Sequence, residues 1–227
     1  MQVSRNDTTL AHALAKQEIS KASAKLHAGA GHAILRCNSV KEFVRRVDKL
    51  FADRIIDAAI GRPVGSRATA SVIVVDTATG GNLALTQLIF DAKYPHNERV
   101  RPHTMPIIVQ QHAYARLIQR ITGEQSLGKA VKAIQPHLHA AVGWVRANYP
   151  LEPRAELSVS GLGLEISGSV DSEGALRLKT VIDAACMQSN LRKAWAESDK
   201  IEVRETYVPK LKGKAASTVV LDEVGLT

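Results

Sequence analysis

Aromatic residues are scarce in this sequence, at 4% of 227 residues. An RNA binder that stacks bases on exposed rings needs more of them, so the composition argues against that class. Cysteine is also scarce: Cys37 and Cys186 are the only two, and they lie far apart. That spacing fits neither a disulfide framework nor a zinc site. It favours a reducing compartment, and we expect a cytoplasmic protein.

Long apolar runs are missing as well. No segment approaches the length of a membrane span, and the polar N-terminus shows no signal peptide. We therefore expect no membrane partner. The sequence also lacks a Gly-rich phosphate loop, a nucleophile elbow and a zinc signature. We expect no cofactor, with Mg²⁺ as the alternative.

Positive charge is present in excess. The chain has 30 Lys and Arg residues against 22 Asp and Glu residues, a formal net charge of +8. A basic surface favours polyanionic partners, so nucleic acid is the expected partner. A basic protein with no such partner is the alternative. With 45% hydrophobic and 23% charged residues, the chain is expected to fold around a core.

Two patterns predict helices in the N-terminal part. Residues 7–27 have loosely helical apolar spacing. Ser39 and Glu42 form a capping box, in which each side chain satisfies a free backbone N–H of the first turn. The apolar stripe that follows predicts a helix through Ala59, ended by the glycine and proline beyond it.

The rest of the chain predicts two β-hairpins. Residues 70–76 form a β-branched run, and residues 83–93 follow it after a Gly-rich turn. Residues 94–106 are predicted as a proline-bounded loop. The second hairpin is predicted within residues 157–183, where Leu176, Leu178, Thr180 and Ile182 alternate with the other residues of the last strand.

These elements predict an α+β fold. We expect an N-terminal helical region at residues 1–66. A mixed domain of antiparallel hairpins flanked by helices is expected at residues 67–227.

The most informative stretch is residues 107–122, IIVQQHAYARLIQRIT. His112, Arg116 and Arg120 recur every four residues, which places them along one face of a helix. An imidazole can move a proton near neutral pH, and guanidinium groups bind phosphate. The alternative is a solvated basic face with an ordinary histidine.

A helix with His-x-x-x-Arg-x-x-x-Arg, followed by a hairpin ending in LRLKTVI, resembles the barnase-like and colicin-like toxin ribonucleases. The resemblance covers residues 107–183 and implies metal-independent cleavage of RNA, ahead of DNA. It makes His112 the general base or acid. It assigns stabilisation of the phosphorane charge to Arg116, Arg120 and Lys179. Thr180 would position a phosphate oxygen or the 2′-hydroxyl. A protein partner or inhibitor is a further expectation.

The predicted loop at residues 94–106 is the expected substrate-binding segment. It carries Arg99, Arg101 and His103, and its charge suits a phosphate backbone. A mobile, solvated loop without a binding role is the alternative.

Two other functions remain open. Asp76 with Asp91 and Lys93 resembles the PD-(D/E)xK nucleases, in which two acidic groups hold Mg²⁺ and a lysine steadies the attacking water. The other alternative is a non-catalytic protein that binds nucleic acid or a protein partner through the same basic surface.

Overall fold

The structure is a computed structural model that describes residues 8–25, 36–61, 68–122, 126–183, 200–207 and 219–220. Its helical elements are α1 (Thr8–Lys25), α3 (Val40–Phe51), η2 (Ala52–Arg54), η3 (Thr79–Gly81), α4 (Gln111–Leu117), the π-helical turn η4 (Ile118–Thr122), α5 (Leu127–Ala133) and α6 (Gln135–Asn148). Its strands are β1 (Ile55–Ile60), β2 (Thr69–Thr77), β3 (Leu83–Asp91), β4 (Val100–Val109), β5 (Glu156–Gly161), β6 (Leu164–Val170), β7 (Leu176–Asp183), β8 (Glu202–Tyr207) and β9 (Val219–Val220).

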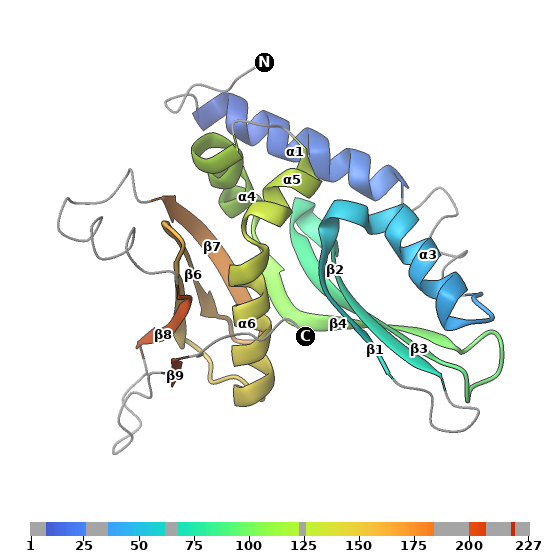
Figure 1. Cartoon of the computed structure of the whole chain (residues 1–227). Helices are drawn as coiled ribbons and strands as arrows, with labels where there is room; N and C mark the ends of the chain where they lie inside the picture. The colour runs from blue at the N-terminus through green and yellow to red at the C-terminus, as the bar shows by residue number, and fades with distance from the viewer. Residues whose placement is uncertain are drawn as a thin grey trace.

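One sheet contains all the described strands, in the order β1-β2-β3-β4-β7-β6-β5-β8-β9. Neighbouring strands are antiparallel except β4 and β7, which run parallel with Ile107 opposite Leu176 and Val109 opposite Leu178. This short parallel contact joins a four-stranded half to a five-stranded half (Figure 1). The predicted α+β class is confirmed.

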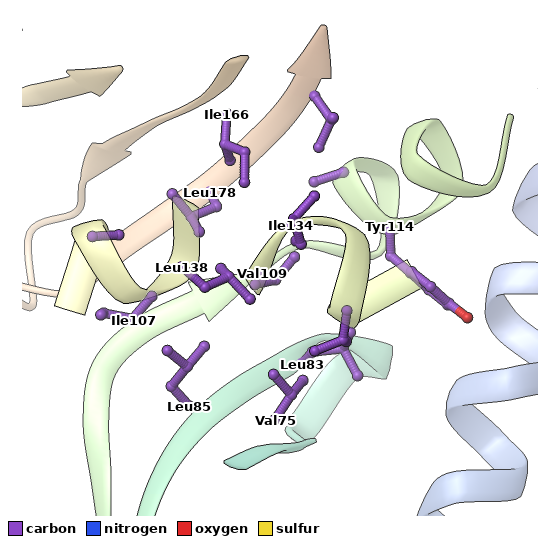
Figure 2. Close-up of a cluster of buried hydrophobic side chains, with 14 of the residues drawn as sticks. Val75, Leu83, Leu85, Ile107, Val109, Tyr114, Ile134, Leu138, Ile166 and Leu178 are labelled. Atoms are coloured by element: carbon purple, nitrogen blue, oxygen red, sulfur yellow. The ribbon is translucent and has the colours of Figure 1, made fainter. Parts of the chain in front are cut away.

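Helices lie on both faces of the sheet because successive strand residues point to opposite sides. In β2, Val72 and Val74 face a core that includes Phe43 of α3. Ile73 and Val75 face the larger core, which α1, α4, α5 and α6 complete. Figure 2 shows this larger core, where side chains of the α4–α6 segment meet those of the sheet.

The predicted cap of α3 is confirmed, but the predicted length of the helix is wrong. Ser39 Oγ accepts a hydrogen bond from the Glu42 N–H at 3.2 Å, as predicted. Glu42 Oε2 accepts one at 2.8 Å from the Asn38 N–H, which precedes the cap residue instead of lying in the first turn. The helix ends at Phe51, and the segment predicted as its continuation forms β1. The apolar residues of β1 suit a strand as well as a helix, and pairing with β2 decides between them.

The predicted loop at residues 94–106 is also partly wrong, because β4 begins at Val100. Pro102 lies opposite Leu88. The Asp91 N–H donates to Arg99 O, and along an antiparallel ladder hydrogen-bonded pairs alternate with pairs that have no hydrogen bond. By that alternation the Pro102 nitrogen points away from β3, where no ladder bond is lost. Pro106 lies within the register shift between β3 and β4, where pairing is interrupted.

The predicted alternation of β7 fails in its second half. Lys179 is an extra residue there, because Ser167 pairs with Thr180 while Gly168 pairs with Leu178. The bulge reverses the faces, so Val181 is buried and Thr180 points to the other side. Gly168 permits this close approach, since an added Cβ would lie 2.3 Å from Arg177 O.

The two predicted regions share the sheet. Strand β1 comes from residues 1–66 and β2 from residues 67–227, and they pair along their length. The predicted division at residue 66 stays a prediction. Of the helices that the structure describes, none has the length and apolar character required to cross a membrane.

Candidate functional site

Helix α4 begins where β4 ends, and the sheet fixes its first turn. The Gln110 N–H donates to Leu178 O at 3.0 Å, and the Gln111 N–H donates to Asn82 Oδ1 at 3.2 Å. Ala113 and Leu117 face the larger core. His112 therefore lies on the outer side of the helix, where it is exposed.

A second histidine, His12 of α1, meets His112. The His112 Nδ1 and His12 Nε2 atoms are 3.2 Å apart, and the tilted rings have centroids 5.2 Å apart. The two residues are 100 positions apart and come together because α1 packs on α4. Sequence reasoning missed His12 as a site residue, because nothing in the sequence of α1 distinguishes it from an ordinary surface histidine.

Arg116 lies one helical turn beyond His112 and contacts its other ring nitrogen. The distance from Arg116 Nε to His112 Nε2 is 3.5 Å, and a second guanidinium nitrogen donates to Gln119 Oε1 at 2.8 Å. A guanidinium N–H can only donate, so His112 Nε2 is assigned as the acceptor. His112 Nδ1 then carries the hydrogen that is donated to His12 Nε2.

The surroundings of His112 favour its neutral form. Partial burial lowers the pKa of His112, and the positive charge of Arg116, the neighbouring His12 and the positive charge of Arg120 lower this pKa further. A neutral imidazole beside guanidinium groups can accept a proton from a bound molecule whose negative charge the guanidinium holds.

Arg120 plays a different part from the one its spacing predicts. Its guanidinium donates to Val181 O at 2.7 Å and so links η4 to β7. This part of β7 lies beyond the residues that pair with β4, at an edge of the ladder. Arg120 thus anchors the helix and adds positive charge near His112, rather than presenting its guanidinium along the outer stripe.

The predicted roles of Lys179 and Thr180 are not supported by their positions. Thr180 faces the side of the sheet opposite Val181, which packs in the core with α4. Lys179 is exposed in the bulge and donates to Ser169 Oγ of the neighbouring strand. The bulge therefore turns both side chains away from His112, and we correct the predicted site accordingly.

The predicted substrate-binding residues lie at the other end of β4. Arg99 donates to Tyr94 O at 3.1 Å and to Asn38 O at 3.3 Å, while Arg101 stacks over the Tyr94 ring at 4.0 Å. His103 is exposed and lies opposite Gln87. From Arg101 the strand runs about 30 Å before α4 begins. These residues and His112 therefore do not form one compact site.

The structure contradicts the magnesium alternative. Asp76 pairs with Ala84 near the turn of the β2–β3 hairpin, whereas Asp91 pairs with Thr69 at its other end. Along β2 these positions are about 23 Å apart, too far for two carboxylates to share one ion. Asp91 Oδ1 instead accepts from the Lys93 N–H at 2.9 Å, which closes a local turn. In the described part of the chain, no three His, Cys, Asp or Glu side chains gather into a metal site.

Comparison with known proteins identifies no family for this chain. No protein-family model matches the chain, and no curated protein or solved structure matches it. The groups brought together by the fold are His12, His112 and Arg116, with Arg120 behind them. They offer proton transfer and phosphate binding on one exposed surface.

Proposed function

We propose that the protein cleaves RNA phosphodiester bonds without a metal ion, using His112, His12 and Arg116. The observation that carries this proposal is the contact of His112 with both other side chains, at 3.2 Å to His12 and 3.5 Å to Arg116. A surface histidine with no function does not require a second imidazole at one ring nitrogen and a guanidinium at the other. The lowered pKa of His112 supports a role as a base.

In the proposed reaction the 2′-hydroxyl of RNA attacks the adjacent phosphorus and the 5′-oxygen leaves. The products are a 2′,3′-cyclic phosphate and a free 5′-hydroxyl. Arg116 turns from His112 Nε2 to the phosphoryl oxygens, which frees that nitrogen to take the 2′-hydroxyl proton. The protonated His112 then gives the proton on Nε2 to the leaving 5′-oxygen, which returns His112 to its neutral form. His12 accepts from His112 Nδ1 and so holds the neutral His112 in the tautomer whose Nε2 is free to take the proton.

RNA is the proposed substrate, ahead of DNA, because this chemistry needs the 2′-hydroxyl. The positive charges of Arg116 and Arg120 supply attraction for the phosphate backbone. At the far end of β4, Arg101 and His103 are exposed and can contact a strand that extends beyond the cleaved bond. We place the reaction in the cytoplasm, where RNA is accessible and the two cysteines stay reduced.

The direct test compares RNA with the same oligonucleotide carrying one 2′-deoxy nucleotide at the cleavage position, in the presence of a chelator. The proposal predicts cleavage of the RNA, a cyclic phosphate on the product, and no cleavage at the deoxy position. Loss of activity in the chelator, or cleavage of both oligonucleotides, would contradict it.

Nucleic-acid binding without cleavage is the second candidate. The observation that favours it is the exposure of His112 on the outer side of α4, since an acid–base site is more often enclosed. This candidate predicts salt-sensitive RNA binding by the wild-type chain with no cleavage product. A protein partner that covers the same basic surface would compete with RNA in that binding assay.

A further inference from the structure

Two imidazole nitrogens face each other where α1 packs against α4. The helices lie side by side (Figure 1), and His12 Nε2 is 3.2 Å from His112 Nδ1. This separation is longer than the usual length of an N–H hydrogen bond in proteins, about 2.9–3.0 Å. Imidazole nitrogen is also the commonest metal ligand among protein side chains. Two nitrogens in this arrangement can therefore share a metal ion in place of a proton.

The separation of the two nitrogens fits a tetrahedral ion. Zn²⁺ holds imidazole nitrogens at about 2.0–2.1 Å, so two of them at the tetrahedral angle lie about 3.3–3.4 Å apart. Ligands at right angles, as on Cu²⁺ or Ni²⁺, lie about 2.8–3.0 Å apart at similar bond lengths. The observed 3.2 Å is closer to the tetrahedral value. Zn²⁺ thus fits with a movement of about 0.1–0.2 Å between the rings, which needs no change of fold.

We propose that His12 Nε2 and His112 Nδ1 bind one Zn²⁺, and that this ion inhibits the cleavage of RNA. In the part of the chain that the structure describes, no third His, Cys, Asp or Glu joins the pair. Water therefore fills the remaining positions of the ion, and binding is reversible and weaker than at a structural zinc site with four protein ligands. The zinc site rests on the geometry of the pair, whereas the inhibition rests on the proposed function.

Inhibition follows from the position of one hydrogen atom on His112. In the protein without zinc, Nε2 faces the Arg116 Nε–H at 3.5 Å and Nδ1 carries the hydrogen. Zinc takes the lone pair of Nδ1, so this nitrogen gives its proton to water and Nε2 takes one from water. The imidazole stays neutral. Nε2 then has no lone pair to accept the proton of the 2′-hydroxyl, and His112 no longer acts as the base.

Arg116 opposes zinc binding in two ways. Its Nε–H and the new N–H on His112 Nε2 are both donors, so the guanidinium must turn away from the ring. Its positive charge also repels the ion. The guanidinium can turn without leaving the helix surface, because a second nitrogen donates to Gln119 Oε1 at 2.8 Å. Removing Arg116 should therefore strengthen zinc binding, although the proposed function requires the same residue for cleavage.

The first experiment titrates the full-length chain with zinc chloride by calorimetry. The chain has eight histidines, so the site is identified by comparing wild type with His12→Ala, His112→Ala, the double variant and His139→Ala. Each single variant at the pair should bind this zinc at least roughly tenfold more weakly. The double variant should lose no further zinc, and the His139→Ala control should bind like the wild type. Arg116→Ala should bind it roughly threefold more tightly.

The second experiment follows the ring nitrogens of His112 by ¹⁵N NMR and measures RNA cleavage in the same samples. Saturating zinc should move the hydrogen from Nδ1 to Nε2 and stop cleavage, and a chelator should restore both. Wild-type zinc binding that survives in both single variants would overturn the site, as would a hydrogen that stays on Nδ1. Cleavage that continues at saturating zinc would overturn the inhibition. A chain that never cleaves RNA would overturn the proposed function and the inhibition, while the zinc titrations would still decide the site.

Discussion

The two ends of β4 both carry positive charge and histidine, yet they are built differently. At the α4 end, His112 is contacted by His12 and Arg116. At the other end, Arg99 donates to backbone carbonyls and Arg101 stacks on Tyr94. At the α4 end, the functional groups of the side chains contact one another. At the other end, the two arginines contact the β3–β4 connection and the backbone near it.

Under the proposed function, this difference separates residues that take part in the reaction from residues that only attract RNA. The pKa of His112 is lowered by partial desolvation of its ring and by its positively charged neighbours. Neighbours that lower the pKa of a histidine prepare it for proton transfer, whereas an arginine whose neighbours are backbone groups only attracts phosphate. Under the proposed function, substitutions at the α4 end change the cleavage rate, and those at the far end change affinity.

The largest effect is expected for His112→Ala. Losing one acid–base group typically lowers the rate by roughly 100- to 10,000-fold. His112 is exposed, so the melting temperature should change little. RNA cleavage and thermal unfolding are measured side by side, with His139→Ala on α6 as the matched control. Full cleavage by His112→Ala would remove His112 from the mechanism and leave α4 with a structural role.

Arg116→Lys tests whether the guanidinium is needed as more than a charge. Lysine keeps the positive charge but cannot bind phosphate through two parallel N–H groups. We expect roughly tenfold slower cleavage, in kcat more than in KM, because the contact is strongest as charge develops on phosphorus. The kinetic constants of the two proteins provide the measurement. A variant with unchanged kcat would show that Arg116 acts only through its charge.

Arg101→Ala tests the other end of β4. Removing one phosphate contact should weaken RNA binding by a few-fold and lower the slope of log affinity against log salt by about one unit. The cleavage rate at saturating RNA should not change. Titrations at several salt concentrations measure both quantities. A loss of kcat as large as that of Arg116→Lys would break the contrast between the two ends.

The smallest effect concerns the titration of His112, followed by NMR. Arg116 lowers the pKa of His112, so Arg116→Ala should move the His112 midpoint to higher pH, toward its ordinary value. Some lowering should remain, since partial desolvation of the ring is its largest cause. Arg101→Ala is the matched control and should leave the midpoint unchanged. Equal shifts in both variants would mean that the pKa reports net charge rather than the local contact.

Local patterns in the sequence predicted much of the fold. The capping box at Ser39 and Glu42 marks the start of α3, and the β-branched run of β2 identifies the first hairpin. The errors occur where pairing between distant segments decides the structure. Residues 55–60 have apolar spacing compatible with a helix, and their pairing with β2 makes them a strand. The prolines of β4 led to the prediction of a loop. Pro102 is nevertheless compatible with a strand, because its nitrogen points away from β3.

The candidate site was predicted only in part. The spacing of His112 and Arg116 identified α4, because helical periodicity is a local property. His12 could not be found, since its contact depends on how α1 packs on a helix 100 residues away. Thr180 faces away from the core that α4 joins because the bulge at Lys179 reverses the faces of β7. A bulge of one residue leaves little trace in an alternating sequence.

The most direct test of the account is a double-mutant cycle on the histidine pair. The RNA cleavage rates of wild type, His12→Ala, His112→Ala and the double variant are measured in a chelator. If His12 acts through His112, the double variant loses no more activity than His112→Ala, and His12→Ala alone lies between wild type and His112→Ala. Losses that multiply, or a His12→Ala variant as active as the wild type, would show that the two imidazoles do not work together.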